Sequence, residues 1–185
     1  MSTHKLWFLH LFSISFAPVH LYTMRADNAL ASRLDVHWGF SWEGLVVFLL
    51  VMVPNLFYFW LPQADADLVK AEHNGSYRLW TLIEHASQAV MVALLVFLTS
   101  RSSSSFLSPY TLGMAVFLLS YYGMWGFYFR GRRNRLLLLG MAVFPVVYFV
   151  LAQLWLHNVP ALVPTGIFGI AHVWITICDD QQTSK

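Results

Sequence analysis

Charged residues are scarce in this chain, and their scarcity excludes most soluble folds. Only 11% of the 185 residues are Asp, Glu, Lys or Arg, while 58% are hydrophobic. A typical soluble domain has roughly 25% charged residues. A soluble domain of this length cannot bury so much apolar surface in one core. Lipid must therefore be the solvent for much of the chain, and we expect an integral membrane protein.

Cysteine and lysine are scarce as well. The lone cysteine, Cys178, excludes an internal disulfide and a metal or redox site built on a cysteine pair. The three lysines are Lys5, Lys70 and Lys185, and all lie outside the long apolar stretches. This excludes a retinal Schiff base within the membrane. The net charge of +2 is too small to favour nucleic acid as a partner.

Long apolar runs predict the architecture. A helix that crosses a membrane needs about 20 mostly apolar residues. Five stretches meet this requirement, namely 40–61, 77–99, 106–129, 136–156 and 159–178, and a shorter sixth candidate covers 6–22. We predict an all-α integral membrane helix bundle of five or six transmembrane helices that forms one membrane domain over residues 1–185. The last two spans are expected to form an antiparallel hairpin, because only residues 157–158 separate them.

The stretch 6–22 has three interpretations. It is a first transmembrane helix, or it is a secretory signal, since Lys5 precedes an apolar run and the small residues at 28–31 resemble a cleavage site. The third interpretation is that translation starts at Met24. The polar side chains of His10 and His20 suit a signal sequence poorly and favour the transmembrane helix.

Lys and Arg are divided unequally between the two sides of a six-helix bundle. The richer side contains Lys5, Lys70, Arg78, Arg130, Arg132, Arg133, Arg135 and Lys185, and the other side contains Arg25, Arg33 and Arg101. Loops that carry Lys and Arg stay in the cytoplasm. We therefore expect the 130–135 loop and the C-terminus to face the cytoplasm.

Two carboxylates fall at membrane depth, where a charged group costs roughly 2.5–3.5 kcal/mol on insertion scales. Glu43 is one turn inside its predicted helix, beside Trp38 and Trp42, which are typical of membrane interfaces. Glu84 lies roughly 10 Å inside, and it shares one helix face with Thr81, His85 and Gln88, at spacings of three and four. Such a face must look into the bundle or into a water-filled cavity.

Polar and aromatic residues of other predicted helices fall at the same depth as Glu84. The candidate ligand-binding residues of this layer, in the cytoplasmic half, are Asn55, Glu84, His85, Gln88, Tyr121, Tyr122, Trp125 and His172. Two interpretations remain open. The residues form a hydrogen-bonded network that joins the helices, or they line a cavity open to the cytoplasm in which Glu84 and His172 are working groups.

A carboxylate among Trp and Tyr rings suits a small cationic or aromatic molecule. The leading prediction is therefore binding or transport of a small-molecule ligand, with membrane lipid as a further partner. A homodimer is expected, because five or six helices are few for a complete transport path. The alternatives are a membrane-embedded enzyme that acts on a lipid or isoprenoid by carboxylate acid–base chemistry and a non-catalytic membrane subunit.

No catalytic residue and no cofactor is assigned from the sequence. A haem or a metal ion held by His85 and His172 is a less favoured alternative. No His-x-x-x-His or Glu-x-x-His spacing supports a metal site.

Several short motifs carry a resemblance to a known group of proteins. They are Pro54-Asn55-Leu56, Glu84 with Gln88, Tyr121-Tyr122 with Trp125 and Tyr128-Phe129, and Gly169-Ile-Ala-His172. With these motifs the chain resembles a group of small bacterial polytopic integral membrane proteins that have no assigned activity. The resemblance covers roughly residues 42–176. It implies a membrane bundle in a bacterial plasma membrane and nothing about the reaction or ligand.

Overall fold

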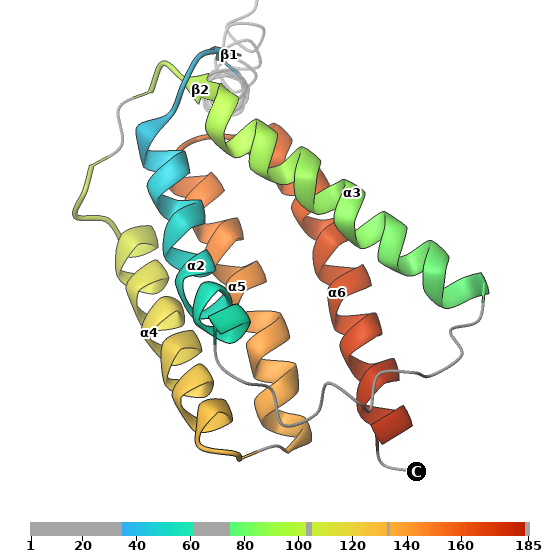
Figure 1. Ribbon diagram of the computed structural model, residues 1–185. Helices are drawn as coiled ribbons and strands as arrows, with labels where there is room; N and C mark the ends of the chain where they lie inside the picture. The colour runs from blue at the N-terminus through green and yellow to red at the C-terminus, as the bar shows by residue number, and fades with distance from the viewer. Residues whose placement is uncertain (1–34, 61–74, 103–104, 133, 184–185) are drawn as a thin grey trace, which may run out of the picture.

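The computed structural model describes residues 35–60, 75–102, 105–132 and 134–183 (Figure 1). They form the helices α2 (Trp42–Trp60), α3 (Gly75–Phe97), α4 (Pro109–Phe129), α5 (Arg135–Trp155) and α6 (Leu162–Thr183), the strands β1 (Val36–Trp38) and β2 (Leu98–Ser100), and a short 3-10 helix, η1 (Val159–Ala161). The predicted all-α bundle is confirmed, since most of the described chain is helical and the two strands have three residues each. The stretch 6–22 lies outside the described residues.

Four of these helices, α3 to α6, are long and apolar enough to cross a membrane. α2 is apolar too but has 19 residues, or about 28 Å at 1.5 Å per residue, slightly less than a hydrocarbon core of about 30 Å. Large apolar side chains point outwards on three of the long helices: Leu82 is 65% exposed, Leu119 is 69% exposed and Val163 is 68% exposed. Outward apolar side chains of this kind are what contact with lipid requires.

The helix ends lie close to the predicted span ends, with the largest difference at the C-terminus of α6. This helix ends at residue 183 instead of 178, because a helical backbone satisfies its own hydrogen bonds and can continue past the last apolar residue. Residues 98 and 99, predicted within a span, belong to strand β2 instead. At the start of α4, Ser108 is the N-cap and forms a capping box with Thr111, so the helix begins at Pro109 and not at 106.

The two tight turns between helices have local causes in the sequence. After α4, Gly131 adopts a left-handed conformation (φ 80°), which places its N–H on the Tyr128 carbonyl. The Asn134 side chain then accepts from Leu137 N–H at 2.7 Å and starts α5. After α5, His157 takes the left-handed position (φ 54°). The predicted antiparallel hairpin of α5 and α6 follows from this turn.

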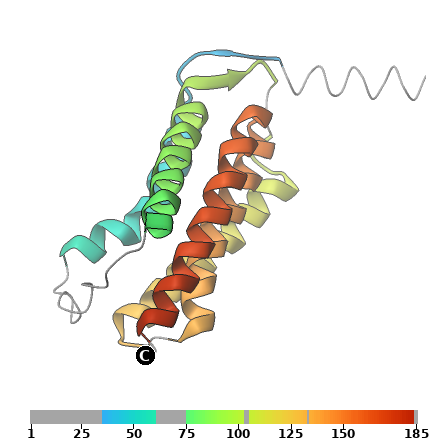
Figure 2. The ribbon, with the colours of Figure 1, turned by 90° about the vertical axis from the view of Figure 1, so that its right-hand side faces the viewer.

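The helices form a curved row with one helix laid against it. α4 packs on α5, α5 on α6 and α6 on α3, while α2 makes smaller contacts with α3, α4 and α5 (Figure 1). The core lies between α2 and the row, where Met91, Leu95 and Ala152 are fully buried. The C-terminal turns of α2 diverge from α5 and α6 (Figure 2), after Pro54, a residue that kinks helices.

A close approach of backbones joins the start of α2 to the end of α3. β1 pairs antiparallel with β2, and Ser41 N–H continues the contact by donating to the Val96 carbonyl at 2.7 Å. Gly44 then lies so near α3 that a Cβ atom at this position would be 2.0 Å from the Leu95 carbonyl oxygen. Only glycine permits this approach. The contact positions α2 against the row.

Candidate functional site

A cavity of about 570 Å³ lies between α2 and the row, and all five described helices contribute to its walls. It is in the half of the bundle that ends at the arginine-containing turn 130–135, where α4 ends and α5 begins. The residues that line it are Phe48, Val51, Met52, Asn55, Tyr58, Glu84, His85, Gln88, Tyr121, Trp125, Pro145, Phe149, Phe168 and His172.

Glu84 and His172 form the central polar contact of this cavity. The Nδ1 atom of His172 lies 2.5 Å from Oε1 of Glu84, which joins α6 to α3. The Glu84 side chain is 12% exposed and that of His172 is 32% exposed. With an ionised carboxylate, Nδ1–H donates to Glu84 and Nε2 remains on the other side of the ring.

Two neighbouring side chains, Phe168 and Ser87, bear on this pair. The ring of Phe168, one turn before His172 on α6, stacks on the imidazole with a centroid distance of 5.1 Å and an interplanar angle of 19°. On α3, the hydroxyl of Ser87 donates to the carbonyl oxygens of Ile83 and Glu84, which leaves the Glu84 carboxylate to His172. The orientation of the imidazole is therefore set by one apolar and one acidic contact.

The opposite wall is aromatic. The ring of Trp125 makes edge contacts with Tyr58 at 5.7 Å and with Tyr121 at 6.3 Å between centroids. The Asn55 amide lies 3.4 Å from the Tyr121 hydroxyl, a long contact. The Nε1–H of Trp125 is buried without a well-formed hydrogen bond, although the Tyr121 hydroxyl is near enough to interact with it. This wall thus combines aromatic rings with a donor that is not fully used.

Seven of the eight candidate residues from the sequence line this cavity. They are Asn55, Glu84, His85, Gln88, Tyr121, Trp125 and His172. His85 is the most peripheral of the α3 residues, since its side chain is exposed while Glu84 and Gln88 are half-buried. Residues from four helices that are distant in sequence therefore meet at one depth.

Tyr122 is the exception, because it does not line the cavity. Its hydroxyl donates to the Leu50 carbonyl oxygen at 2.5 Å. Pro54 lies four residues after Leu50 and has no N–H, so it cannot supply the helical hydrogen bond that this carbonyl would normally accept. Tyr122 replaces the missing donor, and its place in α4 is explained by the structure of α2 rather than by a ligand.

Several further residues line the cavity that were not predicted from the sequence, although a helical repeat indicates some of them. Phe168 lies four residues before His172, Tyr58 lies three after Asn55, and Val51 lies four before it, so each shares a face with a candidate residue. Phe48, Met52, Pro145 and Phe149 complete the apolar lining. Their residue types are equally common on lipid-facing surfaces, which is why composition alone did not select them.

Polar residues of the other half of the bundle form a different kind of arrangement. The Gln153 amide donates to Thr165 Oγ1 at 2.6 Å, and this hydroxyl donates to the Ala161 carbonyl at 2.8 Å. The Asn158 amide donates to the carbonyls of Leu94 at 2.8 Å and Leu98 at 3.0 Å, which fastens the α5–α6 turn to the end of α3. These fully buried side chains join helices and line none of the cavities described here.

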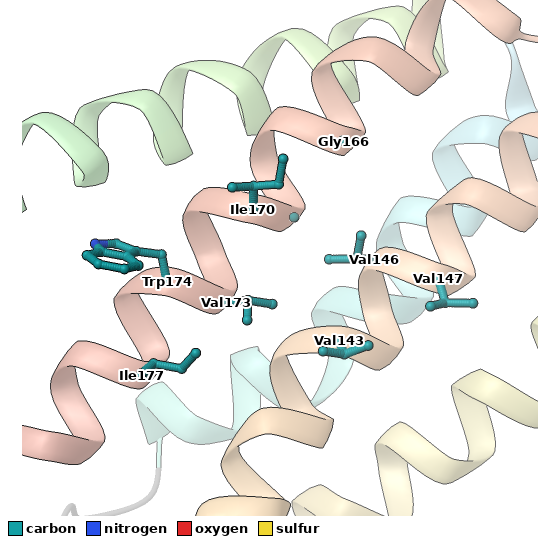
Figure 3. Close-up of a pocket in the computed structure, with 9 residues that line it drawn as sticks. Val143, Val146, Val147, Gly166, Ile170, Val173, Trp174 and Ile177 are labelled. Atoms are coloured by element: carbon teal, nitrogen blue, oxygen red, sulfur yellow. The ribbon is translucent and has the colours of Figure 1, made fainter.

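Two further hollows lie on the outside of the bundle. The groove between α5 and α6 has a volume of about 510 Å³ and is lined by valine, isoleucine, glycine and Trp174 (Figure 3). The groove between α2 and α4 is about 570 Å³, and Glu43 is among its lining residues. The first has no titratable side chain and offers only apolar contact, as expected of a surface against lipid.

The described residues contain no group of three or more His, Cys, Asp or Glu side chains placed to hold a metal ion. His85 and His172 line the same cavity, but His172 directs Nδ1 at a carboxylate of the protein. The haem alternative stays a prediction that no observation favours.

The composition, the long apolar helices and their outward apolar side chains define a polytopic all-α membrane protein. No family model, no curated protein and no solved structure matches the chain.

Proposed function

We propose that the protein binds a small molecule in the cavity around Glu84 and His172 and carries it towards or across the membrane. The observation that supports this most strongly is the direct contact of a membrane-embedded carboxylate with an imidazole at the wall of a cavity of about 570 Å³. Ionisable groups at membrane depth are costly and are retained where they work on a ligand, ion or proton.

The alternative is that the pair only joins α3 to α6. The Gln153–Thr165 contact shows what such a joint looks like in this protein: it is fully buried and lines none of the cavities described here. Glu84 and His172 instead line a cavity, together with the Gln88 amide and the Trp125 indole. Ionisable side chains that line a cavity can contact a ligand, whereas a fully buried joint cannot.

The arginines support an orientation with the cavity in the cytoplasmic half. Arg78, Arg130, Arg132 and Arg135 are near the end of the bundle where α3 and α5 begin and α4 ends, while Arg101 is at the other end. By the positive-inside rule the first end faces the cytoplasm. The C-terminal end of α6 lies on the same side (Figure 1). The plasma membrane of a bacterium remains the expected location.

Native mass spectrometry of gently purified protein tests the proposal. We expect the wild type to retain a small molecule, the E84Q variant to lose it, and the E43Q variant to keep it. Glu43 is the matched control, because it is a carboxylate near the membrane surface that lines a different groove. The same spectra report whether the protein is a homodimer.

A retained ligand in E84Q, with thermal unfolding unchanged, would show that Glu84 does not hold it. A wild type that never carries a bound molecule, together with an E84Q variant that no longer folds, would support the structural joint instead. If a retained lipid is chemically converted by the wild type and not by E84Q, the enzyme alternative replaces binding.

A further inference from the structure

The cavity contains one carboxylate and no lysine or arginine among the described residues that line it. An ionised carboxylate without a counter-charge is strongly disfavoured inside a membrane. Among the described lining residues, only His85 and His172 can become cationic, as imidazolium groups. His172 is the one in contact with Glu84, whereas the His85 side chain is exposed. A carboxylate and a neutral imidazole together carry one negative charge. The lining of the cavity is therefore close to neutral only when the Glu84–His172 pair holds one proton more than that.

Other titratable groups near the pair do not change this balance. They are Tyr58 of α2, Tyr77 and His85 of α3, Tyr121 of α4 and Asp179 of α6, while α5 contributes Pro145 and Phe149, which do not titrate. Asp179 accepts from the Tyr77 hydroxyl at 2.9 Å, towards the end of α3 and α6. It lies outside the cavity lining and supplies no cationic group to it.

We infer that the ligand is a small organic cation with an apolar body, and that it enters in exchange for one proton of the Glu84–His172 pair. This inference rests on the proposed function. Before binding, the pair is carboxylate and imidazolium, with no net charge. The cation takes the place of the imidazolium beside Glu84, His172 releases its proton to water, and the occupied site again has no net charge. One positive charge enters and one leaves.

The aromatic wall suits the remainder of such a ligand. Trp125 lies edge to face with Tyr58 and Tyr121, so that several ring faces border one cavity with Glu84. Aromatic faces attract cations, most strongly where water is excluded. Methyl or methylene groups on the cation fill the apolar lining of Phe149 and Phe168. A neutral ligand of the same shape gains the apolar contacts but has no reason to displace the proton.

Benzyltrimethylammonium is a suitable probe, because a quaternary ammonium group cannot release a proton of its own. Calorimetric titration in buffers of different ionisation enthalpy counts the protons released by the protein. We expect one proton per bound cation and an affinity that rises tenfold per pH unit over the range in which the pair titrates. Neopentylbenzene, the neutral isostere, is expected to bind with no pH dependence and no proton release.

Variants test which side chains hold the cation and which hold the released proton. E84Q is expected to lose the cation and the proton release but to bind neopentylbenzene, which shows that it is folded. H172Q is expected to move the pH range of release, since the carboxyl group alone then holds the proton. E43Q is expected to behave as the wild type.

Cation binding without proton release would overturn the exchange, and so would a pH profile that H172Q leaves unchanged. Either result leaves the proposed function intact if native mass spectrometry still shows a molecule lost in E84Q. Failure of benzyltrimethylammonium to bind the wild type at millimolar concentration would overturn the cationic ligand class.

Discussion

The contact of Tyr122 with the Leu50 carbonyl leads to a sharp test of how α2 is held. In a Y122F variant this carbonyl loses its donor, and Pro54 cannot provide another. The contact lies on the outside of the bundle, where lipid and not water surrounds it, so no solvent molecule replaces the hydroxyl. A hydrogen bond within a membrane contributes about 0.6 kcal/mol on average and up to about 1.7 kcal/mol. We expect Y122F to destabilise the protein by about 1–1.5 kcal/mol.

A double-mutant cycle isolates the physical reason. In a P54A background, residue 54 has an N–H that donates to Leu50, so the further change Y122F is expected to cost less than about 0.5 kcal/mol. The coupling free energy between the two positions is then about 1 kcal/mol. The assay is thermal or denaturant unfolding in detergent, followed by tryptophan fluorescence.

Y148F is the matched control for this cycle. The Tyr148 hydroxyl also donates to a carbonyl of α2, that of Val47, at 3.3 Å. Val51, four residues later, has a backbone N–H, so this carbonyl keeps a helical donor when the hydroxyl is removed. We expect no coupling of Y148F with P54A. Equal costs for Y122F with and without Pro54 would refute the explanation of Tyr122.

Three further predictions concern packing and orientation. G44A is expected to lower the free energy of unfolding by about 2 kcal/mol, because its Cβ would be 2.0 Å from a carbonyl of α3, whereas G123A, which has no neighbour within 4 Å, is expected to be neutral or stabilising in the same unfolding assay. N158L is expected to destabilise by about 2 kcal/mol, since it leaves two carbonyls at the end of α3 without their donor; a cost close to zero would show that the turn is held otherwise. In a background without the native cysteine, R132C is expected to react with a membrane-impermeant maleimide only in permeabilised cells and W38C in intact cells, and the reverse pattern would invert the proposed orientation.

The five described helices and most of the site were predictable because their signals are local or depend only on depth. An apolar run of about 20 residues has few uses other than crossing a membrane, and Glu84 cannot face lipid whatever its partners are. Counting residues from the predicted helix ends then places Asn55, Trp125 and His172 near the same level. An error of a few residues in a predicted helix end does not change this common level, because it shifts the depth of each residue by only a few ångströms.

Other features depend on which face of a helix meets which neighbour, and depth does not contain that information. Tyr121 and Tyr122 are adjacent and chemically identical, yet one lines the cavity and the other supports α2. Tyr58 and Phe168 became recognisable only beside Asn55 and His172. The strand pair at residues 36–38 and 98–100 was missed because it joins segments about 60 residues apart that have no strong local pattern.

The sequence alone determined that this is a membrane bundle, where its described helices lie, which end carries the arginines, and that Glu84 needs a polar environment. Each of these follows from the cost of exposing charge or backbone to lipid, a cost that depends on the residue and its depth. Only the tertiary structure decided that the environment of Glu84 is an imidazole at the wall of a cavity. That outcome depends on the rotation of α3 and α6 about their axes, which packing against α2 and α5 sets and which no single helix encodes.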